Sequence, residues 1–155
     1  MAGTAFPCLD HGDSMVALEE FVHMTTEEPS GHGDTLIDNT SLARLRVLDR
    51  PGRPSVFAKV VNQYLESAQQ TVEQLREALR RSDAALLRAT AHRLKSSSAQ
   101  LGALTVAARC QELESMGQAC RVEGAQEVFA RLETDYRQVA DRLKAELASI
   151  TGGSR

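Results

Sequence analysis

Hydrophobic residues recur at three- and four-residue spacing through most of the chain from about residue 35 to 149. This spacing places apolar side chains on one face of an α-helix, and no segment shows the alternation typical of a half-buried strand. The pattern predicts one short helix followed by four long amphipathic helices with short connections. The predicted fold is therefore all-α: an antiparallel up-down four-helix bundle, with the short additional N-terminal helix covering one end.

Local signals predict where these helices begin and end. Thr40 or Ser41 can cap the short helix, because a hydroxyl oxygen at the N-cap accepts a hydrogen bond from a free backbone amide. Two prolines in residues 51–54 end that helix, since proline cannot continue the backbone hydrogen bonding. The first long helix is expected over about residues 55–81, and Ser82 can cap the second.

The second long helix is expected to end at Gly102, because glycine readily adopts the left-handed conformation found just past helix ends. The third carries Cys110 in its apolar stripe, and Gly117 weakens its end. The last begins near Ala125. Residues 1–34 contain Gly, Pro, Ser and acidic residues in loose order and predict a flexible N-terminal tail or linker that can hold one short helix. Residues 150–155 predict a disordered C-terminal tail.

Composition and charge exclude several function classes. Hydrophobic residues make up 42% of the chain, which is enough for a core. The formal net charge is −3 and Lys and Arg form no block, so we expect no nucleic-acid binding. No apolar run approaches the roughly 18 residues that span a bilayer, and the N-terminus lacks a secretory signal. We therefore expect a cytoplasmic location without direct membrane contact. Three cysteines without C-x-x-C or zinc-site spacing predict no metal site.

His92 lies on the second long helix, away from its apolar stripe. On a helical wheel the stripe consists of Leu87, Ala91, Leu94, Ser98 and Leu101. His92 falls about 140° from the centre of this stripe, so it is expected on the surface.

The predicted surroundings of His92 are small or cationic. Ala85, Ala89, Ser96 and Ala99 leave the imidazole accessible to another protein, and Arg88 and Lys95 lie within one turn of it. A neutral imidazole is a nucleophile near pH 7, and a phosphoryl group is an electrophile whose transfer needs mainly positioning and charge neutralisation. Most exposed helical histidines are only solvated, so the wheel alone leaves both interpretations open.

The stretch HRLKSSSAQLGA, from His92 to Ala103, resembles the signature of histidine phosphotransfer (HPt) domains, approximately H-x-L-K-G-S-S-x-x-L-G-A. The segments LIDNTSLARLRVL, LREALRRSDAALLRATAHRLK and CQELE extend the resemblance over about residues 35–149. One position departs from it: Ser96 stands where the family commonly has glycine. The Ser96 hydroxyl can hydrogen-bond a phosphoryl oxygen or the Nδ1 side of the ring.

The resemblance implies a phosphorelay intermediate with an HPt-type bundle. His92 would accept a phosphoryl group through Nε2 from a receiver-domain phosphoaspartate and pass it to another receiver. Lys95 would support the charge of that group, Gly102 would be structural, and Ala85, Arg88, Ala89, Ser96 and Ala99 would form the receiver-docking face. The implied partners are receivers of a hybrid sensor kinase and of a downstream response regulator. The only metal implied is Mg²⁺ on the receiver, so the chain needs no cofactor of its own.

Two other interpretations stay open at this stage. A bundle that docks a regulator without relaying phosphate would keep the small-residue face but would need no reactive histidine. A metal- or cofactor-binding bundle would need inward-facing E-x-x-H pairs, which the predicted stripes lack. No nucleotide-binding glycine loop follows a strand, so we expect a carrier without ATP-dependent kinase activity. The sequence leaves open whether it is a free-standing protein or a domain of a hybrid kinase.

Overall fold

The structure is a computed structural model that describes residues 36–152. Helix α2 spans Asn39–Val47, α3 Val56–Arg80, α4 Ala84–Leu101, α5 Leu104–Gln118 and α6 Ala125–Gly152. No strand occurs in this part of the chain, in agreement with the all-α prediction. The predicted N-terminal tail or linker, residues 1–34, lies outside the described residues, as do the last three residues of the predicted C-terminal tail.

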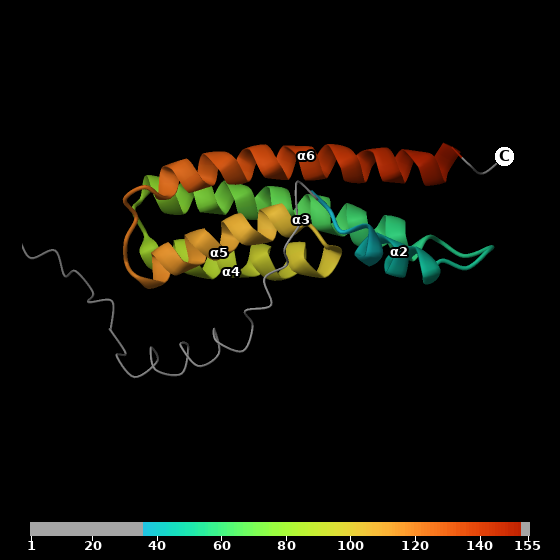
Figure 1. The fold of residues 1–155 in the computed structure, drawn as a ribbon, viewed down its shortest axis with the longest axis horizontal. Coiled ribbons are helices and arrows are strands. Elements are labelled where there is room, and N and C mark those ends of the chain that lie inside the picture. The colour runs from blue at the N-terminus through green and yellow to red at the C-terminus, as the bar shows by residue number, and fades with distance from the viewer. Residues whose placement is uncertain (1–35, 153–155) are drawn as a thin grey trace, which may run out of the picture. The chain divides into compact units, whose positions relative to one another are not determined.

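The four long helices form an antiparallel bundle. Figure 1 shows α3, α4, α5 and α6 running side by side, each reversing the direction of the one before it. In the bundle α3 packs on α4, α4 on α5, α5 on α6, and α6 on α3, which closes the ring. Helix α2 packs on α3 and α4 at one end, so the predicted architecture is confirmed. None of the helices in the described segment has the length and hydropathy needed to cross a bilayer.

The core is built from the predicted apolar stripes. Every residue assigned to the stripe of α4 is buried, including the polar Ser98. Tyr64 on α3 lies in the same core, and its hydroxyl is 2.9 Å from the Ser98 Oγ. Burial raises the pKa of the Tyr64 hydroxyl above its ordinary value, so this contact joins two neutral hydroxyl groups. Cys110 is fully buried, as predicted.

Both predicted N-caps were wrong. The N-cap of α2 is Asp38, which accepts a hydrogen bond from the backbone N–H of Thr40, and the N-cap of α4 is Asp83. Ser82 has a φ of 52° and follows the last turn of α3, where the backbone N–H of Asp83 donates to the Ala78 carbonyl oxygen. Because Ser82 completes the end of α3 in this left-handed conformation, the next residue becomes the cap.

The end of α5 agrees with the sequence, since the helix ends at Gln118, one residue after Gly117, which is buried. The end of α6 differs from the prediction. Helix α6 continues to Gly152, three residues beyond the predicted end of the bundle at residue 149. The extension has a packing reason, since Ile150 lies partly buried against the core.

Candidate functional site

Helix α4 holds His92 on the surface of the bundle. Leu87, Ala91 and Leu94 point into the core and are at most 1% exposed, which fixes the rotation of the helix. The His92 side chain is 59% exposed as a consequence. The position predicted from the wheel is therefore confirmed.

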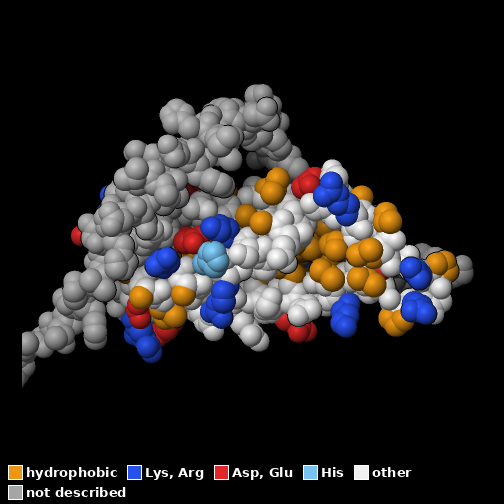
Figure 2. All heavy atoms as spheres, turned by 90° about the horizontal axis from the view of Figure 1, so that it is seen from below, with side chains coloured by type: hydrophobic (Ala, Val, Ile, Leu, Met, Phe, Trp, Pro, Cys, Tyr) orange, Lys and Arg blue, Asp and Glu red, His pale blue; other side chains and the backbone are white. Residues whose placement is uncertain are grey.

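The residues predicted to surround His92 also lie on the surface. Ala85, Arg88, Ala89, Ser96 and Ala99 are all exposed. Figure 2 shows the histidine on this face with Lys and Arg side chains gathered around it, and an apolar patch farther toward the α2 end. The small residues leave the imidazole open to a large approaching surface. The position of these residues agrees with a docking face, although docking itself stays a prediction.

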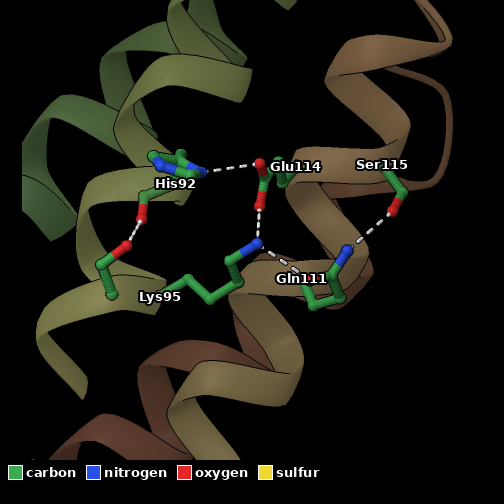
Figure 3. Close-up of polar contacts among 6 residues, drawn as sticks. His92, Lys95, Gln111, Glu114 and Ser115 are labelled. Carbon is green, nitrogen blue, oxygen red and sulfur yellow. Dashed lines mark hydrogen bonds and ion pairs between the residues drawn. The ribbon is translucent and has the colours of Figure 1, made fainter. Parts of the chain in front are cut away.

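Glu114 on α5 contacts the His92 ring. Its Oε1 lies 2.8 Å from His92 Nδ1, so the contact joins α5 to α4. The Glu114 side chain is only 14% exposed, whereas the ring is mostly exposed. Figure 3 shows the ring turning Nδ1 toward Glu114, with its second nitrogen pointing away.

Lys95 contacts the same carboxylate from the other side. Its Nζ lies 2.5 Å from Glu114 Oε2 and donates a hydrogen bond of 2.9 Å to Gln111 Oε1. Burial raises the pKa of the Glu114 carboxyl, but the hydrogen bonds from Lys95 and His92 outweigh it, and the net shift of that pKa is downward. Glu114 is therefore ionised at neutral pH and lies between two nitrogen donors.

This contact decides which nitrogen of a neutral His92 ring keeps a free lone pair. An ionised carboxylate has no proton to donate, so the hydrogen of a neutral imidazole that bonds to it must be on Nδ1. The lone pair available for attack is then on Nε2, the nitrogen that faces away from Glu114. The arrangement presents a nucleophilic nitrogen to an incoming electrophile and holds the opposite nitrogen against a carboxylate.

The sequence matches the Hpt domain family over residues 59–146, which include His92 and Glu114. The chain belongs to this family. Hpt domains carry phosphoryl groups on histidine in phosphorelays, and they interact with receiver domains.

Solved structures of histidine-containing phosphotransfer proteins share the fold of this Hpt domain. HptB from Pseudomonas aeruginosa PAO1 is 24% identical, with 74% of this chain and 96% of that chain covered and a TM-score of 0.67. ZmHP2 from maize is 21% identical, covers 86% and 95% of the two chains, and has a TM-score of 0.66. MtHPt2 from Medicago truncatula is 19% identical, with coverages of 96% and 98% and a TM-score of 0.66. A comparison with curated protein sequences found no match.

At Ser96, this Hpt domain departs from the common glycine, and the serine hydroxyl bonds the helix backbone. The Ser96 Oγ donates a hydrogen bond of 3.0 Å to the backbone carbonyl oxygen of His92. The Nδ1 side of the ring, which we considered as a partner for this hydroxyl, is bonded to Glu114 instead. The hydroxyl is therefore used within the helix backbone in this structure.

Gly102 is structural, and it has two separate reasons to be glycine. It ends α4 with a φ of 86°, a conformation that side chains rarely adopt. A Cβ at this position would also lie 2.8 Å from the Cβ of Ser41 on α2. The backbone N–H of Asp38 donates to the Gly102 carbonyl oxygen at 2.8 Å, so the end of α4 anchors the start of α2.

Glu114 and Gln111 were missed as site residues by sequence reasoning. Both lie in the CQELE segment, residues 110–114, which we used only to extend the family resemblance. The available signal was an acidic residue next to Leu113 in the apolar stripe of α5, at the edge of the buried face. Within residues 36–152, no group of three or more His, Cys, Asp or Glu side chains is arranged to hold a metal ion.

Proposed function

We propose that this Hpt domain accepts a phosphoryl group on Nε2 of His92 from a receiver-domain phosphoaspartate and passes it to the aspartate of another receiver. The observation that carries the proposal is the contact between His92 Nδ1 and Glu114, because it leaves the lone pair on the exposed nitrogen. Membership of the family supports the carrier role, and the geometry supports the choice of atom.

The transfer step is a displacement at phosphorus. The lone pair of Nε2 forms the new N–P bond while the P–O bond to the aspartate breaks, and its electron pair returns to the aspartate carboxylate. The proton on Nδ1 stays in place, so the phosphorylated ring is cationic. Glu114 lies 2.8 Å from that nitrogen and stabilises the positive charge as it develops. Transfer to the next receiver is the same step in reverse.

Lys95 would support the charge of the phosphoryl group after a change of partner. In the structure the Lys95 Nζ lies against Glu114. Once the ring is cationic, it can replace Lys95 as the ionic partner of that carboxylate. The flexible lysine stem then lets the ammonium turn toward the phosphoryl oxygens. The remaining charge would be neutralised by Mg²⁺ bound to the receiver.

The docking surface would combine the small-residue face around His92 with a neighbouring groove that is lined by both apolar and polar side chains. That groove lies between α2, α3 and α4 and is lined by Leu45, Val60, Gln63, Tyr64, Ser67, Ser97, Gln100 and Leu101. Figure 2 shows an apolar patch on the same face as the histidine. An apolar area beside a polar reactive centre gives a partner both buried surface and orientation.

The test is incubation of the full chain with a phosphorylated receiver and Mg²⁺. We expect acid-labile, base-stable phosphate on the wild-type chain and none on His92→Gln. Incubation with ATP and Mg²⁺ in the absence of a kinase should label neither. If a receiver binds the chain but no cognate phosphorylated receiver labels it, the chain docks regulators without relaying phosphate. Label on His92→Gln would place the acceptor elsewhere.

A further inference from the structure

We propose that Gly117 is a positioning residue for His92: it lets α5 approach α4 closely enough for the Glu114 carboxylate to reach Nδ1. This inference rests on the proposed function for its effect on transfer, but its effect on the imidazole ring can be measured without any partner.

The backbones of α4 and α5 come close together at Gly117. A Cβ added to this buried glycine would lie 2.8 Å from the carbonyl oxygen of Ala84, 2.8 Å from the backbone nitrogen of Arg88 and 2.9 Å from its Cβ. Non-bonded carbon contacts are optimal at about 3.5–4.0 Å. Ala84 and Arg88 are four residues apart, so two of the contacted atoms belong to the backbone hydrogen-bonding positions of the first turn of α4. Such atoms cannot turn aside as the end of a long side chain can.

This contact is one helical turn from the site. Gly117 lies three residues after Glu114 on α5, a rise of about 4.5 Å, and Arg88 lies four residues before His92 on α4, a rise of about 6 Å. The two helices are antiparallel, so both steps lead toward the same end of the bundle. A side chain at position 117 would therefore separate the helices beside the His92–Glu114 pair.

The His92–Glu114 contact has little tolerance for such a separation. The distance between Nδ1 and Oε1 is 2.8 Å, and hydrogen bonds of this type extend to about 3.2 Å. Relieving a contact of 2.8 Å with backbone atoms requires a displacement of several tenths of an ångström or more, on the order of that tolerance. Glu114 is also only 14% exposed, so it has limited freedom to follow the ring. The expected result of Gly117→Ala is a folded bundle with a weakened hold on Nδ1.

The control is Gly152→Ala, another glycine-to-alanine change, at the last residue of α6. Nothing lies within 4 Å of a Cβ built at Gly152, so only the intrinsic helix preference changes there. In the full-length chain without a receiver, ¹⁵N NMR of the imidazole ring should show predominantly the Nδ1–H tautomer for the wild type and for Gly152→Ala. Gly117→Ala should shift the ring toward the Nε2–H tautomer while circular dichroism keeps the wild-type helix content.

The transfer rate gives the second measurement. Gly117→Ala should slow phosphoryl transfer from a phosphorylated receiver by about tenfold, close to the effect of Glu114→Ala, because both weaken the same contact. When Glu114 is already alanine, adding Gly117→Ala should change the rate less than twofold, since residues that act through one contact are not additive. A merely structural role would slow both backgrounds equally, and that result would overturn the proposal, as would an unchanged tautomer ratio in folded Gly117→Ala.

If Gly117→Ala does not fold, Glu114→Asp tests the same premise, namely that the contact with Nδ1 depends on the distance between Glu114 and the ring. Aspartate keeps the charge but withdraws the carboxylate by one methylene, about 1.5 Å, without adding atoms between the helices. If Glu114→Asp retained the Nδ1–H tautomer and the wild-type rate, the distance between the carboxylate and Nδ1 would not be critical, and the proposal would be overturned. If the wild-type chain takes no phosphoryl group, the proposed function fails, but the tautomer measurement still decides the role of Gly117.

Discussion

Replacing Glu114 by alanine is expected to slow phosphoryl transfer to His92 about 10- to 30-fold. The substitution removes a charge-assisted hydrogen bond of 2.8 Å to Nδ1 from a carboxylate that is mostly buried. Such bonds contribute about 1.5–3 kcal/mol. Lys95 Nζ lies 2.5 Å from the other oxygen and shares the negative charge, so we expect the lower part of this range, about 1.5–2 kcal/mol. Each 1.36 kcal/mol in the barrier corresponds to about a tenfold change in rate.

Replacing Glu114 by glutamine should have a smaller effect. Its amide oxygen can still accept a hydrogen bond from Nδ1–H, but the negative charge that stabilises the imidazolium is lost. A loss of about 1 kcal/mol corresponds to a rate about fivefold lower than that of the wild type. The expected order of rates is therefore wild type, then Glu114→Gln, then Glu114→Ala.

The assay is single-turnover transfer from a radiolabelled phosphoreceiver, with thermal unfolding measured on the same samples. Glu112→Ala is the matched control, because it removes an acidic side chain from the same helix that pairs with Arg109 rather than with the site. This variant should transfer within about twofold of the wild type, since exposed ion pairs contribute little. Equal rates for wild type and Glu114→Ala would refute the role of the carboxylate, and so would equal losses in Glu114→Ala and Glu112→Ala.

Other substitutions test the remaining parts of the site and its support. Ser96→Ala and Ser96→Gly should transfer within about twofold of the wild-type rate, because the hydroxyl bonds a backbone carbonyl oxygen; a tenfold loss in both would assign it a role in transfer. Ala89→Arg and Ala99→Arg should weaken receiver binding at least tenfold by calorimetry and leave the helix content unchanged, and unchanged affinity would remove both from the docking face. Gly102→Ala should lower the free energy of unfolding, measured in denaturant, by about 1–3 kcal/mol more than Gly52→Ala. Both glycines have positive φ, but only a Cβ at Gly102 would contact another residue, Ser41. Equal losses in the two variants would refute the importance of that contact.

The fold and the position of His92 could be predicted because both depend on short-range periodicity. The spacing of Leu87, Ala91 and Leu94 fixes which side of α4 faces the core, and this determines the exposure of every other residue on the helix. The architecture follows from long helices with short connections. The choice of N-cap could not be predicted in the same way. Ser82 and Asp83 are both good capping residues, and the choice depended on how the preceding helix ends.

Glu114 could not be assigned from the sequence for a different reason. Its contact with His92 spans 22 positions along the chain and depends on the rotation and separation of two helices. Neither quantity appears in the periodicity of either helix, which specifies only the direction of the core. The separation depends on the close backbone approach at Gly117, and in the sequence this glycine indicates only a weak point in a helix.

Two independent arguments support Nε2 as the reactive atom that we propose. An exposed histidine on a helix is ordinary, and its exposure of 59% would suit a solvated side chain as well as a nucleophile. The family resemblance implies attack through Nε2, but it cannot show what holds the ring of this chain. The Glu114 contact leads to the same nitrogen through hydrogen-bonding capacity alone, since an ionised carboxylate can only accept. A contact between Glu114 and Nε2 would have left the lone pair on Nδ1 and contradicted the resemblance. The contact is with Nδ1 instead, so the two arguments together support Nε2 more strongly than the resemblance alone.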